Sequence, residues 1–219
     1  MNDYFMDNAM DKQVLIFLDR EFGSGGHNIA KMIAQNLEIP YYDYNLLTEM
    51  FKGEDAHLAE ALSSFDEKPV DFFGSRRVRG LSNSMEEILL EKQFEFIGNK
   101  AKNGDSFVVV GRCAEVILGE YPNFISLFVR ARLEARIERV MRREGKTREE
   151  SLKKIKRIDA MHRRYFNKVS KNKWGHSRSY DLVVRSSDMR LEDLAEALMP
   201  YIRARIDMFG KYFPGAHLQ

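Results

Sequence analysis

A short apolar run followed at once by a cluster of glycines is the feature that most limits the fold of this chain. The run VLIFL at positions 14–18 is continuous and apolar, which is typical of a strand buried on both faces. The glycines of 20–28 come next, and apolar residues then recur at helical spacing over 28–37 until Ile39-Pro40 ends the pattern. A strand, a glycine loop and a helix in this order predict the beginning of an α/β fold.

Further apolar runs continue this alternation along the chain. Strand character is found at three more places and helical periodicity at four, namely 107–110, 124–129 and 182–184 for strands and 85–102, 133–143, 148–169 and 191–209 for helices. Strands that alternate with helices of this length need crossover connections, which place a parallel sheet between two layers of helices. We therefore predict a three-layer α/β/α architecture.

Length and composition are those of one globular domain. The 219 residues are 44% hydrophobic and 31% charged, which excludes the disordered and fibrous classes. The first twelve residues include three aspartates and no apolar stretch typical of a signal peptide, and no segment approaches the roughly 18 apolar residues of a membrane span. A single cysteine, Cys113, excludes an internal disulfide. We therefore expect a cytoplasmic protein with no membrane partner.

The glycine segment, DREFGSGGHN at positions 19–28, is the strongest chemical signal. Glycines between a strand and a helix let successive backbone N–H groups converge on an anion, and the helix dipole adds to their attraction. We predict a phosphate site here; a tight turn without a ligand is the structural alternative. A dinucleotide-binding loop is a minor alternative: Gly23 and Gly25 begin that pattern and Asp43 lies about 20 residues on, but Asn28 replaces its third glycine.

The segment also departs from the common phosphate-loop pattern G-x-x-x-x-G-K-[ST]. With Gly25 as the second glycine, Arg20 takes the place of the first, Gly26 that of the lysine and His27 that of the hydroxyl residue. The lysine normally offsets charge on the transferred phosphate. Arg20 at the strand end is the candidate replacement cation, and a surface salt bridge to Glu21 or Asp43 is the alternative.

Basic residues gather in the second half of the chain. Positions 130–157 hold twelve Lys or Arg against five Glu, and 163–178 hold six more with no acid. On the helix expected at 132–143, one stripe beside the apolar face carries four arginines, Arg132, Arg136, Arg139 and Arg143. Such a stripe suits a lid that closes over a phosphate. For Arg132 and Arg142 we prefer a solvated role, with Glu138 and Arg142 as an i,i+4 pair.

Five motifs, taken in order, make the sequence similar to the cytidylate kinase-like proteins, a branch of the P-loop nucleoside monophosphate kinases. They are REFGSGG at 20–26, PYYD at 40–43, GRCA at 111–114, WG at 174–175 and YDL at 180–182. The resemblance implies a P-loop kinase fold with a five-stranded parallel sheet, ATP and Mg²⁺ as cofactors, and a nucleotide or related small molecule as phosphate acceptor.

The resemblance also implies a division of the chain and roles for residues. We interpret 1–219 as one kinase domain with its core at 13–53, 85–130 and 180–210, an acceptor-binding insertion at 54–84 and a basic lid hairpin at 131–179. We expect catalytic roles for Arg20, Asp43, Arg136, Arg139 and Arg143; nucleotide-phosphate binding by Gly23, Ser24, Gly25, Gly26, His27 and Asn28; and acceptor binding by Arg76, Arg77, Arg112, Asp159, Arg163 and Arg164.

Departures from the family pattern leave other functions open. Cys113 stands where true cytidylate kinases have aspartate after Gly-Arg, and His162 stands where related proteins often have arginine. Together with the missing lysine, these residues motivate a catalytically silent nucleotide-binding or regulatory protein as the alternative to a kinase. A nucleic-acid surface on the basic hairpin ranks last, because no nucleic-acid motif accompanies it. The apolar end of the chain, at 208–213, could pack in a homodimer.

Overall fold

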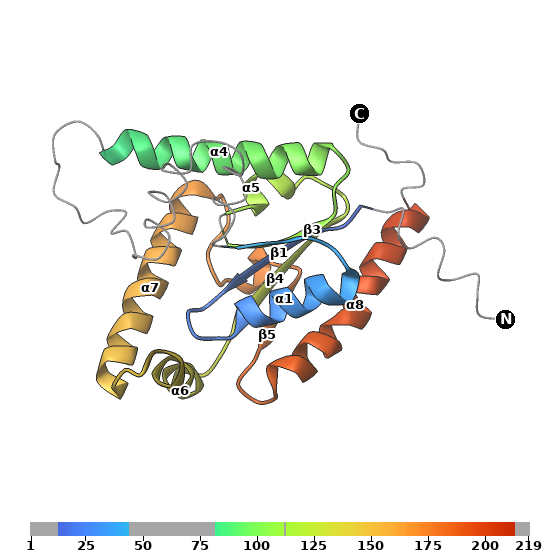
Figure 1. The fold of residues 1–219 in the computed structure, drawn as a ribbon. Helices are drawn as coiled ribbons and strands as arrows, with labels where there is room; N and C mark the ends of the chain where they lie inside the picture. Colours follow the sequence, from blue (N-terminus) through green and yellow to red (C-terminus); the bar gives the residue numbers. More distant parts are fainter. Residues whose placement is uncertain (1–12, 44–81, 112, 213–219) are drawn as a thin grey trace.

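The computed structural model describes residues 13–43, 82–111 and 113–212. Within these residues a five-stranded sheet lies between helices on both faces, so the predicted three-layer α/β/α fold with a parallel sheet is confirmed (Figure 1). Most of the predicted acceptor-binding insertion lies outside the described residues.

The strands of the sheet run parallel in the order β2-β3-β1-β4-β5. Leu15 pairs with Phe107 on one side and Phe124 on the other, so β1 is the central strand. From one edge to the other, the strands are β2 (Tyr41–Tyr42), β3 (Phe107–Val110), β1 (Leu15–Arg20), β4 (Phe124–Arg130) and β5 (Leu182–Arg185).

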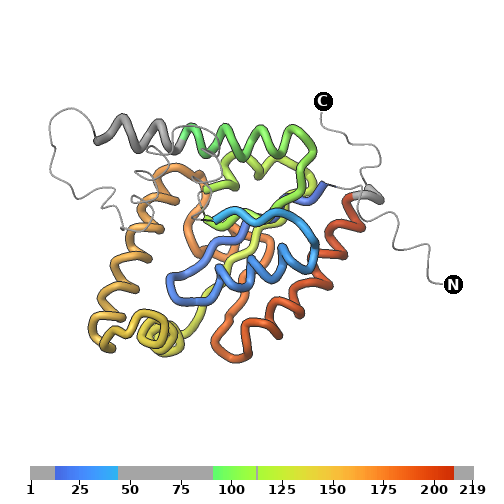
Figure 2. The backbone as a smooth tube through the Cα atoms, viewed as in Figure 1, coloured from blue at the N-terminus to red at the C-terminus, as the bar shows by residue number. Residues whose placement is uncertain are grey.

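Successive side chains of β1 enter two different cores, because side chains alternate between the faces of a strand. Ile16 and Leu18 pack with the helices on one face, and Leu15 and Phe17 with those on the other. The first face is covered by α1 (Gly26–Leu37) and α8 (Leu191–Tyr212), and the second by α4 (Ser82–Lys102), α5 (Glu115–Leu118) and the end of α7 (Arg148–Val169) (Figures 1 and 2). The apolar part of the central strand, Leu15 to Leu18, is thus fully buried, as its unbroken apolar run predicts.

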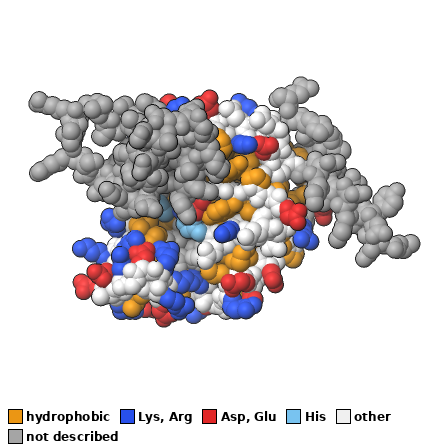
Figure 3. All heavy atoms as spheres, viewed as in Figure 1, with side chains coloured by type: hydrophobic (Ala, Val, Ile, Leu, Met, Phe, Trp, Pro, Cys, Tyr) orange, Lys and Arg blue, Asp and Glu red, His pale blue; other side chains and the backbone are white. Residues whose placement is uncertain are grey.

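The basic hairpin consists of α6 (Leu133–Glu144) and α7, and it forms at the predicted positions. Gly145 ends α6 at φ +65°, and Thr147 opens α7 with the predicted capping box to Glu150. Ile137, Val140 and Ile155 make a small core between the two helices. Lys and Arg side chains gather over this hairpin, mixed with a few carboxylates (Figure 3).

The helices differ from the predicted ones mainly at their ends. The pattern at 28–37 predicts the apolar face of α1, but the helix begins two residues earlier, at Gly26, because its first turn has no apolar side chain to mark it. No helix in the described ranges is long and apolar enough to cross a lipid bilayer.

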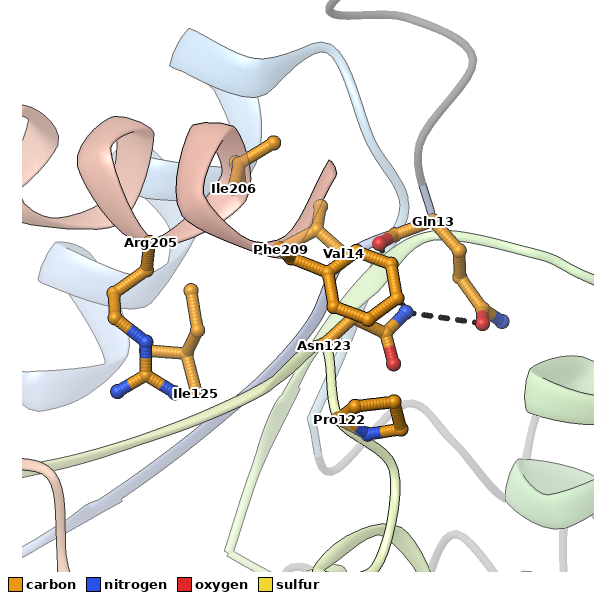
Figure 4. Close-up of a pocket in the computed structure, with 8 residues that line it drawn as sticks. All are labelled: Gln13, Val14, Pro122, Asn123, Ile125, Arg205, Ile206 and Phe209. Carbon is orange, nitrogen blue, oxygen red and sulfur yellow. Dashed lines mark hydrogen bonds between the residues drawn. The ribbon is translucent and has the colours of Figure 1, made fainter. Parts of the chain in front are cut away.

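A small pocket lies at the N-terminal ends of the central strands (Figure 4). The glycine loop lies at the opposite, C-terminal ends of these strands. Its volume is about 10 Å³, which is room for about one water molecule. Asn123 donates from Nδ2 to the backbone oxygen of Gln13 at 2.8 Å, and Arg205 donates to the backbone oxygen of Phe124 at 3.1 Å. The hydrogen bonds around this pocket therefore connect separate chain segments, and the pocket is too small for a metabolite.

Candidate functional site

The glycine loop turns sharply from the end of β1 into α1. Gly23 and Gly25 have φ angles of +80° and +86°, which lie in the left-handed region that side chains disfavour. Gly25 is the N-cap of α1, and no described side chain caps the helix. The N–H groups of the first helical turn therefore point out of the helix without a capping partner, as in phosphate-binding loops.

The loop forms the floor of a cleft with a volume of about 480 Å³, which lies within the size range of small-ligand sites. Its lining comes from four elements: the loop and start of α1 (20–23 and 25–28), the end of α6 (Arg139, Arg142 and Arg143), α7 (His162) and the start of α8 (Met189, Arg190 and Leu191). The predicted phosphate loop and the basic hairpin thus face one cavity.

The side chain of Arg20 passes Gly26, the residue that stands in place of the missing lysine, and reaches Gly111. A Cβ atom placed on Gly26 would be 2.6 Å from the Cβ of Arg20, and one placed on Gly111 would be 2.8 Å from its Nη1. Both distances are too short for real Cβ contacts, so glycine at 26 and 111 leaves the path that Arg20 needs. A guanidinium group therefore stands between the phosphate loop and the end of β3.

A chain of hydrogen bonds runs from Arg20 to the end of β2. Arg20 donates to Nε2 of His27 from Nη2 at 3.2 Å and from Nε at 3.4 Å. His27 in turn bonds through Nδ1 to Oδ2 of Asp43, and the Tyr41 hydroxyl donates to the same oxygen at 2.7 Å. The predicted residues Arg20, His27 and Asp43 are thus brought together, although they belong to three different elements.

Two buried carboxylates near Arg20 have opposite pKa shifts. Burial raises the pKa of Asp43, but the hydrogen bond from His27, together with Arg20 and Tyr41, outweighs burial and leaves this pKa lowered. For Asp19, burial dominates over Arg20 and Tyr180 and raises the pKa. Asp43 is therefore a stable anion at neutral pH, ready to hold the ring of His27.

Arg139 braces the back of the glycine loop. Its Nη1 donates to the backbone oxygen of Ser24 at 2.9 Å, and its Nη2 donates to that of Ser186 at 2.6 Å. The Ser186 hydroxyl also donates to the Ser24 backbone oxygen. The Ser24 side chain is fully buried, so this residue serves the cleft through its backbone. Arg139, predicted to be catalytic, lines the cleft while its guanidinium fixes the Ser24–Gly25 peptide.

Arg136 and Asp159, both on the hairpin, form a clasp that holds the loop backbone on either side of Phe22. The Phe22 N–H donates to Oδ1 of Asp159 at 2.9 Å, and Nε of Arg136 donates to the Phe22 backbone oxygen at 2.7 Å. Arg136 also bonds Oδ2 of Asp159 and lies 3.4 Å from Glu21. The Phe22 ring packs against the small core of the hairpin. The hairpin and the loop are therefore held together as one unit.

The prediction that four guanidinium groups line one edge of the hairpin is wrong, because the four side chains have different surroundings. Arg136 is buried, with 6% of its side chain exposed, and Arg132 points to Asp188 at 3.3 Å. Arg142, which we expected to pair with Glu138 in solvent, lines the cleft, and among the described residues it forms no ion pair within 4.0 Å. The reason is that the small apolar core turns Arg136 inward and leaves the last turn of α6 facing the loop.

The structure describes only some of the remaining predicted residues. Arg163 stacks over the ring of Trp174, with 5.4 Å between its Cζ and the ring centroid, and Trp174 is buried against Phe128. Arg164 is exposed on α7, and Asn28 lines the cleft. Arg76, Arg77 and Arg112 lie outside the described residues.

Three features of the site have no clear signal in the sequence. Phe22 anchors the loop in the hairpin core, Ser186 holds Ser24, and Met189 to Leu191 form a wall of the cleft. A Cβ on Gly25 would lie 2.7 Å from the Leu191 side chain, so α8 begins in contact with the loop. Only the order of the strands, which puts β5 beyond β4, could have predicted that this segment meets the loop.

A magnesium ion fits this site only in company with phosphates. The described residues contain no group of three His, Cys, Asp or Glu side chains able to hold a metal. Kinase Mg²⁺ is normally bound by one or two carboxylates together with substrate phosphates and water. Asp43, ionised and next to the loop, is a carboxylate of the required kind.

Comparison with solved structures finds a protein of the same fold. An uncharacterised protein from Eubacterium ventriosum is 33% identical, with a TM-score of 0.68, and the match covers 87% of this chain and 98% of that one. A shikimate kinase from Acinetobacter baumannii in complex with shikimate is 13% identical, with a TM-score of 0.48, and the match covers 90% and 96%. The similarity to the shikimate kinase is too low to carry information about the substrate of this chain.

Comparison with known sequences assigns the family. No protein of curated function matches the sequence. The model of the cytidylate kinase-like family matches residues 15–188, which include the glycine loop, the sheet and the basic hairpin. The family and the P-loop kinase fold support a phosphotransferase. The chain therefore belongs to the cytidylate kinase-like family.

Proposed function

We propose that the protein is a kinase that transfers the γ-phosphate of ATP to a nucleoside monophosphate or a related small acceptor. The observation that carries this proposal is the path of Arg20, whose side chain passes Gly26, the residue that stands in place of the usual lysine, and brings its guanidinium beside the loop. In this proposal Arg20 supplies the cation that the absent lysine would have supplied. Family membership supports the general reaction and leaves the acceptor to be identified.

The loop and the basic hairpin supply what phosphoryl transfer needs. In this proposal the N–H groups of the loop and of the first turn of α1 hold the phosphates, and Arg20 offsets charge on the group in transit. Arg142, Arg143 and Arg190 line the same cleft and add positive potential for the triphosphate. An oxygen of the acceptor attacks the γ-phosphorus, the bond to the β-phosphate oxygen breaks, and ADP leaves. Mg²⁺, bound with ATP, would neutralise the phosphate oxygens.

Hydrogen bonds from the hairpin and from Ser186 to the loop backbone explain how the N–H donors of the loop stay aligned. Arg139 and Ser186 hold the oxygen of Ser24, and Asp159 and Arg136 hold both sides of Phe22. Donors that are fixed before the reaction stabilise charge without having to reorient, which is the main source of catalysis in transfers of this kind. We propose that the loop is preorganised by these four side chains.

The test is ADP formation by purified protein with Mg²⁺·ATP and a panel of nucleoside monophosphates and small alcohols. We expect acceptor-dependent turnover with at least one of them and a loss of at least 100-fold in kcat for Arg20→Ala, in line with the loss of one electrostatic donor. Arg132→Ala is the matched control, because Arg132 is exposed and outside the cleft. An Arg20→Ala variant as active as wild type would refute the proposal.

The absence of lysine at position 26 favours a second candidate, a catalytically silent nucleotide-binding protein. Both candidates bind ATP in the cleft, and only the kinase turns it over. ATP binding by calorimetry without ADP formation with any acceptor in the panel would favour the silent protein.

A further inference from the structure

His27 stands where phosphate loops usually have serine or threonine, and its ring connects two functional elements. It lies in the first turn of α1, its side chain is 40% exposed, and it lines the cleft. One ring nitrogen faces Arg20 and the other faces Asp43. No serine or threonine has two polar atoms that could connect both partners in this way.

The partners determine which nitrogen of the ring carries the proton. A guanidinium group has only N–H donors, so Nε2 of His27 must accept from Arg20 with its lone pair. The proton is then on Nδ1, which donates to the carboxylate of Asp43. The Tyr41 hydroxyl donates to the same Asp43 oxygen at 2.7 Å and holds the carboxylate from the other side. The neutral Nδ1–H form is thus the one that fits both contacts.

The guanidinium of Arg20 is shared between two anchors on opposite sides. Nη1 lies 3.6 Å from Oδ1 of Asp19, the preceding residue of β1, which is 3% exposed. Nη2 and Nε face His27. Without His27, Nη2 and Nε of Arg20 would lose this partner, and the contact of Nη1 with the buried Asp19 would remain.

We propose that His27, oriented by Asp43, is a positioning residue that holds the Arg20 guanidinium between the start of α1 and Gly111, where it meets the transferred phosphate. The inference rests on the proposed function, since it assigns Arg20 the task of the missing lysine. The two bonds to His27, at 3.2 and 3.4 Å, are at the long end of the hydrogen-bond range, so Arg20 keeps its direction and can still be drawn to a phosphate.

The first experiment needs no nucleotide. Two-bond ¹H–¹⁵N spectra of the full chain at neutral pH report which nitrogen of each histidine carries a proton, and His27→Gln identifies the signal of His27. We expect a neutral His27 ring protonated on Nδ1. A ring protonated on Nε2, or on both nitrogens, cannot accept from Arg20 and would overturn the inference whatever the protein phosphorylates.

The second experiment measures the Kd of Mg²⁺·ATP by calorimetry for a cycle of variants. We expect His27→Leu to weaken binding about tenfold, because Arg20 loses the partner that aims it. His27→Gln restores most of this loss, since its amide can accept from Arg20 and donate to Asp43. In an Arg20→Ala background, His27→Leu has less than a twofold effect, because His27 acts only through Arg20.

The control is His176→Leu, which removes an exposed histidine that lies outside the cleft and leaves the affinity unchanged. Equal affinities of wild type and His27→Leu, or full additivity of His27→Leu with Arg20→Ala, would overturn the inference and leave the proposed function standing. Wild-type protein that binds no Mg²⁺·ATP would overturn the proposed function and the inference together.

Discussion

A Cβ atom on Gly26 would lie 2.6 Å from the Cβ of Arg20 and 2.9 Å from its Cγ, so the two positions cannot both carry a normal side chain in this geometry. The arginine at 20 and the glycine at 26 are therefore sterically coupled. The cation comes from the end of β1, and the loop has no side chain at 26 that would block it.

This coupling predicts how the loop responds to a restored lysine. Gly26→Lys alone forces Arg20 out of its place and should weaken Mg²⁺·ATP binding at least tenfold. Arg20→Gly with Gly26→Lys recreates the common pattern G-x-x-x-x-G-K and should bind at least tenfold better than Arg20→Gly alone. Calorimetry on the three variants measures both effects, and Gly98→Ala is the matched control because nothing lies within 4 Å of a Cβ there.

The clasp of Arg136 and Asp159 predicts a loss of stability. Arg136→Ala leaves a carboxylate that is 14% exposed without its buried partner, which should lower the free energy of unfolding by about 3–5 kcal/mol. Arg132→Ala should change it by less than about 1 kcal/mol, because the Arg132–Asp188 pair is exposed to solvent. Urea denaturation followed by circular dichroism compares the two, and equal values would show that the clasp contributes nothing.

The lining of the cleft predicts a role for Arg142. Arg142→Ala removes a cation from the wall and should raise the Kd of Mg²⁺·ATP about fivefold at low salt, with a smaller effect at high salt because exposed charges are screened. Arg132→Ala, outside the cleft, serves as the comparison. An unchanged Kd for Arg142→Ala would mean that the triphosphate does not extend along this wall.

Glu115 predicts a dependence of stability on pH. Burial, with the nearby charge of Asp19, raises its pKa to about 7, and this outweighs the lowering by the Ser170 hydroxyl and the Glu115 backbone N–H. The unfolded chain loses this proton near its ordinary pKa of 4.5, whereas the folded protein keeps it up to about 7. The folded state therefore loses stability as pH rises from 4.5 to 7, and the full loss of about 3 kcal/mol persists above pH 7.

Glu115→Gln removes this effect. It should raise the free energy of unfolding by about 3 kcal/mol at pH 8 and leave it nearly unchanged at pH 4. Denaturation at both pH values, with the exposed Glu120→Gln as the reference, makes the measurement. A gain of the same size at both pH values would exclude the ionisation of Glu115 as its cause.

Local features of the sequence were sufficient for much of the fold. The limits of α7 and β3 agree with the pattern residue by residue, because apolar periodicity and a capping box are properties of neighbouring residues. The position of the glycine loop was predictable for the same reason, since a strand, glycines and a helix follow one another directly. The two-residue strand β2 is not among the strands predicted from the apolar pattern, because so short a strand has no periodicity; only the resemblance implied a fifth strand.

The partner that each charged side chain contacts was determined only by the tertiary structure. Helical spacing puts Arg136 and Arg139 on one stripe, but packing against Phe22 buries the first with Asp159 and turns the second to Ser24 and Ser186. Likewise, His27 meets Asp43 because β2 lies beyond β3 in the sheet. Spacing along the chain gives the direction of a side chain on its own element; its partner depends on which elements pack together, and that is a property of the whole fold.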